Sequence, residues 1–219
     1  MRFVLMADLH GLFETVVDGE IQALSVPDGD AVILAGDATN VGRLDEVGRF
    51  LAWFAMLPHQ HKIFCAGNHD FLAQQEPRFF REMVAEYPSL TYLQDSGTVI
   101  NGFKVWGSPW STIFMDWAFM LTEEQLAEKW ALIPDDTQVL ITHSPPYGFL
   151  DALGTQHLGS KSLAQRVNEL DKLKLSVFGH IHCRYGAIRH PQALKKLFVN
   201  ASICTESYEP INPIRVVDL

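Results

Sequence analysis

The chain has 219 residues, of which 47% are hydrophobic and 20% charged, so its composition is that of a globular protein and not of a disordered or fibrous one. Its formal net charge of −9 disfavours a protein that binds polymeric nucleic acid through a basic face. Cys65, Cys183 and Cys204 are odd in number and widely spaced, so we predict neither a disulfide framework nor a CxxC metal motif.

The sequence carries no sign of a membrane or secretory segment. The apolar start, residues 3–7, is too short for the hydrophobic region of a signal peptide before Asp8 interrupts it. No apolar run reaches the length of a membrane span. We therefore expect a cytoplasmic protein without a membrane partner. Because no linker, repeat or low-complexity segment divides the chain, we expect residues 1–219 to form a single domain.

In the first half, short apolar runs alternate with patterns typical of helices. Apolar residues recur every three or four positions from 44 to 54, which predicts a helix that ends near Pro58. A second helix is predicted over residues 76–86. Continuous apolar runs predict buried strands over residues 3–7 and 31–35, and a third short strand is predicted over residues 62–66. This alternation indicates an α/β fold.

In the second half, local signals predict a hairpin and two helices. Asn101-Gly102 suits a type I′ turn between strands 98–100 and 103–107. Thr122 and Gln125 form a capping-box pattern that opens a helix to about Ile133. The segment 108–119 is rich in Trp, Phe and Met, and predicts core or a lid, with some aromatics in a substrate pocket. The remaining predicted elements are a helix at 162–173 and strands at 139–142, 175–178, 185–188, 197–200 and 214–217.

Metal-ligating side chains follow five of these strands. Taken singly, each has a simpler explanation, such as an aspartate that forms a turn or a histidine that bonds a neighbouring carbonyl. Because strands wound in this way gather functional groups at their carboxyl ends, the joint occurrence predicts one metal site. The residues are Asp8 and His10, Asp37, Asn68, His143, and His180 with His182.

The blocks that contain these residues resemble the calcineurin-like metallophosphoesterase superfamily. The blocks are Asp8-x-His10, Gly36-Asp37, Gly67-Asn68-His69-Asp70, His143 and Gly179-His180-Ile181-His182. Gly107-Ser108-Pro109-Trp110, Thr142 to Phe149 and Asn200-Ala201-Ser202 are further similar to the branch of metallophosphoesterase-domain-containing (MPPED-type, or brain protein 239-like) proteins. This resemblance covers nearly the whole chain.

The resemblance implies a four-layer αββα sandwich of two mixed sheets flanked by helices, with a two-metal site between the sheets. It implies that one ion is held by Asp8, His10 and His182, that the other is held by Asn68, His143 and His180, and that Asp37 bridges them. His69 would face the leaving group, oriented by Asp70. The ligands suit Mn, Fe, Zn, Co or Ni, and the resemblance makes Mn²⁺ the ion we expect in vitro.

Two divalent ions about 4 Å apart stabilise charge on both the attacking and the leaving oxygen of a phosphoester. With two ionised aspartates and a hydroxide, the site would carry about +1, which attracts a phosphate monoanion. Our hypothesis is that the bridging hydroxide attacks phosphorus in line, while His69 protonates the leaving oxygen as general acid. Asp70 would raise the pKa of His69. Alternatively, His69 makes a purely structural contact.

No arginine follows Gly36-Asp37, where phosphoprotein phosphatases of the superfamily hold a phosphate dianion. We therefore expect a phosphodiesterase that acts on a small substrate, by resemblance a cyclic nucleotide such as a 2′,3′-cyclic one. The rival functions are a phosphomonoesterase, a DNA nuclease and a non-catalytic scaffold that binds phosphate. The candidate pocket residues are Asn68, Trp110, Phe114, Trp117, Tyr147, Arg184 and Tyr185, whose aromatic rings would stack a base.

Overall fold

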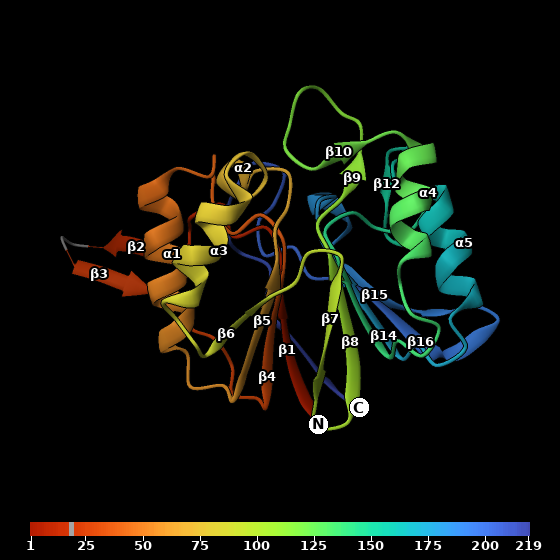
Figure 1. Ribbon diagram of the computed structural model, residues 1–219, viewed down its shortest axis with the longest axis horizontal. Coiled ribbons are helices and arrows are strands. Elements are labelled where there is room, and N and C mark those ends of the chain that lie inside the picture. The colour runs from red at the N-terminus through yellow and green to blue at the C-terminus, as the bar shows by residue number, and fades with distance from the viewer. Residues whose placement is uncertain (18–19) are drawn as a thin grey trace.

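A computed structural model describes residues 1–17 and 20–219 and contains two large β-sheets packed face to face, with helices on their outer faces (Figure 1). The first sheet has the order β17 (Arg215–Asp218), β1 (Arg2–Met6), β4 (Ala31–Ala35), β5 (His61–Cys65) and β6 (Leu90–Tyr92). The second has the order β15 (Gly186–His190), β16 (Ala193–Asn200), β14 (Leu175–Phe178), β11 (Val139–Thr142), β8 (Phe103–Ser108) and β7 (Ser96–Ile100).

The helices and three small ribbons complete the described elements. The helices are α1 (Leu44–Met56), α2 (Phe71–Gln75), α3 (Pro77–Ala85), α4 (Glu123–Ala131), α5 (Lys161–Glu169) and a 3₁₀ turn at His182–Arg184. The ribbons pair β2 (Glu14–Val17) with β3 (Glu20–Ala23), β9 (Ser111–Thr112) with β10 (Met120–Leu121), and β12 (Ala152–Leu153) with β13 (Gln156–His157).

The central strands of each sheet are parallel. β1, β4, β5 and β6 run in one direction, as do β8, β11, β14 and β16, whereas the edge strands β17, β7 and β15 are antiparallel to their neighbours. The two sheets are joined beyond their strands by a parallel bridge between Ala7 and Ser202. The loops that follow the parallel strands therefore meet at one end of the sandwich.

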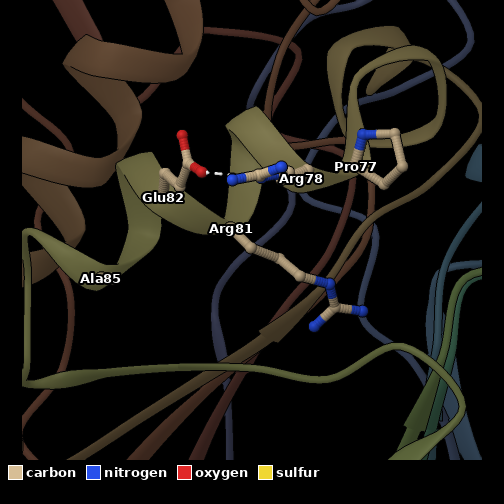
Figure 2. Close-up of a pocket in the computed structure, with 5 residues that line it drawn as sticks. All are labelled: Pro77, Arg78, Arg81, Glu82 and Ala85. Carbon is tan, nitrogen blue, oxygen red and sulfur yellow. Dashed lines mark hydrogen bonds and ion pairs between the residues drawn. The ribbon is translucent and has the colours of Figure 1, made fainter.

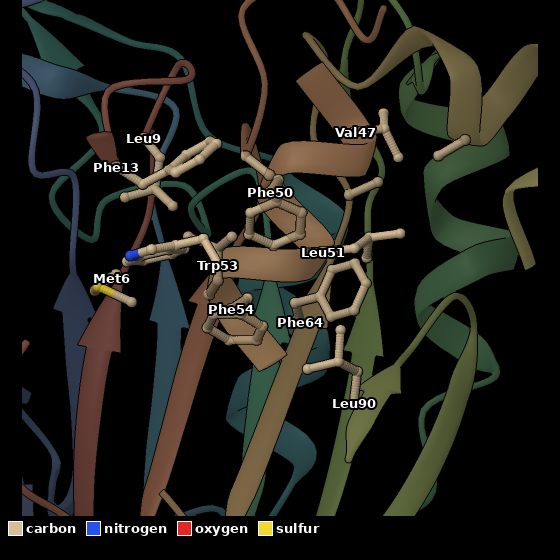
Figure 3. Packing of buried hydrophobic residues seen from close by; sticks show 14 of the residues in the cluster. Met6, Leu9, Phe13, Val47, Phe50, Leu51, Trp53, Phe54, Phe64 and Leu90 are labelled. Carbon is tan, nitrogen blue, oxygen red and sulfur yellow. The ribbon is translucent and has the colours of Figure 1, made fainter. Parts of the chain in front are cut away.

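Three hydrophobic clusters fill the three spaces between four layers. Phe3 and Leu5 of β1 point between the two sheets, whereas Val4 and Met6 point to the helical side. β4 alternates in the same way, and burial on both faces explains why these strands are apolar at every position. Figure 3 shows the outer cluster, in which Phe50 and Phe54 of α1 pack on Phe64 of β5. The third cluster packs α4 and α5 against the second sheet.

The predicted four-layer αββα sandwich is confirmed, and so are the hairpin and the capping box. Asn101 and Gly102 have φ values of 45° and 83°, as a type I′ turn requires, and Thr122 caps α4 together with Gln125. The predicted helix 162–173 is too long, since α5 ends at Glu169 and Leu170 has ψ 83°. Residues 170 and 173 still point into the core, which imitates the continuation of a helical period.

The outer face of α3 is a solvated helix surface. Pro77, Arg78, Arg81, Glu82 and Ala85 border a shallow hollow there (Figure 2). Arg78 Nε donates to Glu82 Oε1 at 3.1 Å, a pair one helical turn apart that contributes little to stability when exposed. In the described part of the chain, every helix is too short or too polar to cross a membrane.

Candidate metal centre

The loops after β1, β4, β5, β11 and β14 bring all seven predicted ligands to one place. Two groups of side chains can be distinguished by their contacts. In the first, His182 Nε2 lies 3.1 Å from His10 Nε2 and 3.6 Å from Asp8 Oδ1. His182 Nδ1 lies 3.0 Å from the carbonyl oxygen of Thr205, which can only accept. The proton of a neutral His182 therefore resides on Nδ1, and the lone pair of Nε2 points at Asp8 and His10.

The second group is centred on the amide oxygen of Asn68. Asn68 Oδ1 lies 2.8 Å from His143 Nε2 and 2.8 Å from His180 Nδ1. His143 Nδ1 lies 3.0 Å from the carbonyl oxygen of Ala35, so the Nε2 of a neutral His143 also presents a lone pair. Asp37 lies between the groups, with Oδ2 at 3.3 Å from His143 Nε2 and 3.9 Å from His10 Nε2.

In this arrangement, hydrogen-bond acceptors face one another without a donor between them. Asp37 Oδ2, Asn68 Oδ1 and the Nε2 atoms of neutral His143 and His182 are all acceptors, and all are buried or nearly so. Converging buried acceptors are unfavourable unless a proton or a metal cation lies among them. Three sets of candidate ligand atoms lie within 4.8 Å of one another, namely Asp8-His10-His182, Asp8-Asp37-His143 and His10-Asp37-His69. The donor set fits divalent transition metals.

Burial and the two aspartates shift the pKa values of the histidines at this site. Burial alone would lower the pKa of His143, but the Asp37 carboxylate outweighs it and raises that pKa to about 9. Burial of His182 is likewise outweighed by Asp8, which raises the pKa of His182 to about 9. Burial lowers the pKa of His10 to about 4 and that of His180 to about 3. The negative charges of Asp37 and Asp8 therefore favour positive charge at this place.

Three glycines directly precede ligands because neighbouring ligands pack against their backbones. A Cβ on Gly36, whose φ is +90°, would overlap the His143 ring. A Cβ on Gly67 would lie 2.6 Å from Asp37 N and 2.8 Å from His143 Cε1, and one on Gly179 would overlap the Asp8 carboxylate. The Gly-Asp, Gly-Asn and Gly-His pairs of the sequence therefore reflect close approach of the backbone.

A layer of hydrogen bonds holds the ligands in place. Ser202 Oγ donates to Asp8 Oδ2, and His180 N donates to the same carboxylate at 3.0 and 3.1 Å. His69 N donates to Asp37 Oδ1 at 2.8 Å. Such contacts orient carboxylates for metal binding. Ser202 and the carbonyl of Thr205 belong to the segment after β16, for which the sequence predicts no contact with the candidate ligands.

The expected contact between Asp70 and His69 is wrong. The Asp70 carboxylate accepts hydrogen bonds from Gly67 N, Ala38 N, Thr39 N and Thr39 Oγ1 at 2.8, 3.3, 3.0 and 2.7 Å. It therefore joins the loop after β4 to the loop after β5. His69 Nδ1 instead lies 2.6 Å from the carbonyl oxygen of Asn40. Asp70 is turned inward, so it cannot also support the ring of its neighbour.

A pocket of about 620 Å³ opens above the ligands. Asp37, Asn68, His69, His180 and His182 form its polar floor. Its wall comes from the segment between β9 and β10, from residues around β12 and β13, and from the segment after β16. Two predicted pocket residues, Phe114 and Trp117, line this wall, and Asn68 lies on the floor.

The other four predicted pocket residues are not among the described residues that line this pocket, and they have other contacts. Trp110 Nε1 donates to Asp95, and its ring packs edge-on against Phe119 at 5.3 Å. Tyr147 packs against His157. Arg184 Nε donates to the Ala152 carbonyl, and Tyr185 Oη donates to the Pro213 carbonyl at 2.7 Å. None of these contacts involves a residue that lines the cavity.

Tyr208 is a residue of the site that was not predicted from the sequence. The centroid of its ring lies 4.7 Å from that of His10, 5.6 Å from that of His182 and 6.2 Å from that of His69. It lines the pocket, and its backbone is left-handed with φ 58°. Strained backbone in a non-glycine residue is common at functional sites. No sequence pattern indicates Tyr208, because it directly follows neither a predicted strand nor a glycine.

Several known proteins are similar to this chain. The family described as calcineurin-like phosphoesterase matches residues 1–184. Metallophosphoesterase domain-containing protein 1 of Homo sapiens and that of Mus musculus are each 37% identical over 100% of this chain and 71% of their own length. A UPF0046 protein of Caenorhabditis elegans is 32% identical over 94% of this chain and 71% of its own.

Solved structures share the fold at low sequence identity. A crystal structure that covers 99% of this chain and 98% of its own matches with a TM-score of 0.69 at 15% identity. The structure of TT1561 of Thermus thermophilus covers 91% of this chain and 88% of its own, with a TM-score of 0.62 and 14% identity. These two likenesses concern the fold alone.

Proposed function

Because this chain belongs to the calcineurin-like phosphoesterase family and is therefore a metal-dependent phosphoesterase, we propose that it hydrolyses small phosphodiesters with two divalent cations. We propose that its substrates include cyclic nucleotides, among them 2′,3′-cyclic ones. The observation that carries the proposal is that five ligand-type and acid–base side chains, Asp37, Asn68, His69, His180 and His182, line one pocket large enough for a nucleotide.

The residues would divide between two cations according to their contacts. Asp8, His10 and His182 would hold one, Asn68, His143 and His180 the other, and Asp37 both. When bound, divalent cations supply charge for the phosphate oxygens and lower the pKa of water so that hydroxide is available as nucleophile at neutral pH. We propose Mn²⁺ for reconstitution, because the mixed oxygen and nitrogen ligands accept it.

His69 is the side chain that we assign to protonation of the leaving oxygen. Its Nδ1 lies 2.6 Å from the carbonyl oxygen of Asn40, so Nδ1 keeps its hydrogen and Nε2 is the atom that exchanges a proton. The ring is held between His10, with centroids 4.5 Å apart, and Trp117, with centroids 4.3 Å apart. His69 also lines the pocket floor. A fixed imidazole beside the reacting phosphate is suited to general acid catalysis.

The charge of the pocket favours a diester over a monoester. Among the described residues that line it there is no lysine or arginine, and the wall contributes the acidic Glu206. A phosphate dianion is best held by arginine, whose guanidinium forms paired hydrogen bonds with it. A diester carries one negative charge and needs less compensation from the protein.

The test is turnover by the Mn²⁺-reconstituted protein on p-nitrophenyl phosphate, bis(p-nitrophenyl) phosphate, and 2′,3′- and 3′,5′-cyclic nucleotides, with Asp37→Ala as the blank. We expect higher kcat/KM on the diesters and none of this turnover in the blank. Higher efficiency on the monoester would favour the phosphomonoesterase, and cutting of a supercoiled plasmid would favour the nuclease. Turnover equal to the blank on every substrate would favour the non-catalytic scaffold.

A further inference from the structure

The mouth of the pocket gathers exposed hydrophobic side chains. Among the described residues, fifteen large hydrophobic side chains are exposed. Five of them line this single pocket, namely Ile113, Phe114, Met115, Leu153 and Tyr208. Exposed apolar side chains scattered singly need no explanation, but a group around a cavity marks a surface that binds something.

Three of these side chains are consecutive and strongly exposed. Ile113, Phe114 and Met115 are 59%, 61% and 75% exposed. They lie in the segment between β9 and β10, which projects from the top of the molecule in Figure 1. Leaving three large apolar residues in water stabilises nothing in the folded chain. Their position therefore requires a reason outside the fold.

The exposed residues are held over the pocket by anchors at both ends of the segment. On one side, Thr112 Oγ1 donates to the Leu158 carbonyl at 3.2 Å. On the other, Ala118 N donates to the Asn68 carbonyl at 3.1 Å, and Phe119 is fully buried. One anchor thus reaches the backbone of a ligand residue. The apolar residues are presented at a set place relative to the floor.

The wall offers few groups that would read a nucleobase. The Thr112 hydroxyl is already bonded within the protein, and Glu206 adds a negative charge at the mouth. A site built to recognise a base presents donors and acceptors matched to the base edge. The wall also includes Gln156, Cys183 and the hydroxyl of Tyr208, but most of its side chains are aliphatic, aromatic or thioether groups, which bind apolar surface without regard to hydrogen-bond pattern.

We propose that the 113–115 segment, together with Leu153 and Tyr208 of the same pocket, binds an apolar alkyl or aryl substituent of the substrate phosphodiester, so that the preferred substrates are amphiphilic. This inference rests on the proposed function and narrows it to a substrate class. The phosphate lies on the polar floor and the apolar substituent lies against the wall. Cyclic nucleotides are then bound through the faces of their bases, with little discrimination among bases.

The magnitude follows from the area that such a substituent buries. A methylene group that is fully buried changes an affinity about four-fold, and one held at an open rim about two-fold. Methyl hexyl phosphate has five more methylenes than dimethyl phosphate, so its Ki should be about 30-fold lower. Because contacts far from the reacting bond act alike on bound substrate and transition state, the effect belongs in KM and Ki and not in kcat.

The experiment measures competitive inhibition of bis(p-nitrophenyl) phosphate hydrolysis by these two alkyl phosphates. It uses the Mn²⁺-loaded wild type and the double variant Phe114→Ser/Met115→Ser. The matched control is the double variant Phe79→Ser/Met56→Ser. It removes an exposed phenylalanine of α3 and an exposed methionine of α1, and neither residue lines the pocket. Both pairs are exposed, so neither change empties the core.

We expect the wild type and the control to show the 30-fold Ki ratio, and the pocket variant to show a ratio below about five with a raised KM and unchanged kcat. A ratio near one in the wild type, or an equal ratio in the pocket variant, would overturn the inference. Flotation with phosphatidylcholine vesicles is measured as well. If the wild type floats and the pocket variant does not, while the pocket variant keeps the Ki ratio, the inference is also overturned, since the segment would then bind a lipid surface. Absence of diester turnover above Asp37→Ala would instead remove the proposed function.

Discussion

Replacement of Asp70 by asparagine tests whether this carboxylate holds the ligand loops together. The buried carboxylate accepts four hydrogen bonds, from Gly67 N, Ala38 N, Thr39 N and Thr39 Oγ1. Asparagine keeps one acceptor oxygen and places an amino group where the other was. About two of the four bonds are lost, and at least one backbone N–H then faces another donor.

The expected loss of stability is about 3 kcal/mol. Hydrogen bonds to a charged acceptor contribute about 1.5–3 kcal/mol each, so the loss of two costs about 3–6 kcal/mol. Part of this is offset because the variant no longer buries a charge. Burial, together with the nearby Asp37, raises the pKa of Asp70 to about 6, which shows that the ionised carboxylate is disfavoured there. A net loss of about 3 kcal/mol corresponds to about 6–12 °C in Tm for a chain of this size.

The assay is urea denaturation of wild type and Asp70→Asn, with and without chelator, and with Asp116→Asn as an exposed control. The change is also made in a His69→Ala background. If Asp70 joins the two loops, its stability cost persists when the imidazole is absent, because the bonds do not involve that ring. A loss below about 0.5 kcal/mol, or a loss in kcat that disappears in the His69→Ala background, would refute the reasoning and restore a role through His69.

Three further predictions concern the site. His69→Ala should lower kcat far more on esters with poor leaving groups than on nitrophenyl esters, since only the former need a proton donor; equal losses in steady-state kinetics would contradict the acid role. Gly67→Ala should abolish Mn²⁺-dependent turnover, because the added Cβ would overlap Asp37 and His143. Gly48→Ala is the matched control, because a Cβ at that position contacts nothing. It should raise the free energy of unfolding by about 0.5–1 kcal/mol in urea denaturation. Mn²⁺ at about 100 times its Kd should stabilise the wild type by about 2.7 kcal/mol in thermal denaturation, and Asp37→Ala should lose most of this gain; an equal gain in both would place the cation elsewhere.

The strands, and the convergence of the candidate ligands at their ends, could be predicted because both depend on short-range signals. β4 is apolar at five consecutive positions and is followed by Gly36-Asp37, so the strand, its burial and its functional end are adjacent in the sequence. β5 and β14 contain polar residues as well, but each is likewise followed closely by a Gly-Asn or Gly-His pair, Gly67-Asn68 and Gly179-His180. A site assembled from the carboxyl ends of parallel strands is readable from sequence once the strands are identified.

The pocket wall could not be predicted, because its residues come from segments without a regular period. Phe114 and Trp110 are both aromatics in the same stretch, yet Phe114 lines the cavity and Trp110 donates to the partly buried Asp95. Their directions depend on anchors such as the bond from Ala118 N to the Asn68 carbonyl. Sequence spacing contains no trace of such contacts between distant loops.

The metal site also depends on how the two sheets are held against each other. Asp8, His10, Asp37 and Asn68 follow strands of the first sheet, whereas His143, His180 and His182 follow strands of the second. The bridge between Ala7 and Ser202 joins the sheets beside this site, and Ser202 also donates to Asp8. Because each group of ligands draws on both sheets, a small slip between sheets would separate donor atoms that must converge on one cation. The fully buried apolar layer between β1, β4, β11 and β14 resists such a slip, since close-packed side chains do not slide past one another without opening voids. The inner core thus fixes the spacing of the ligands as well as stabilising the fold.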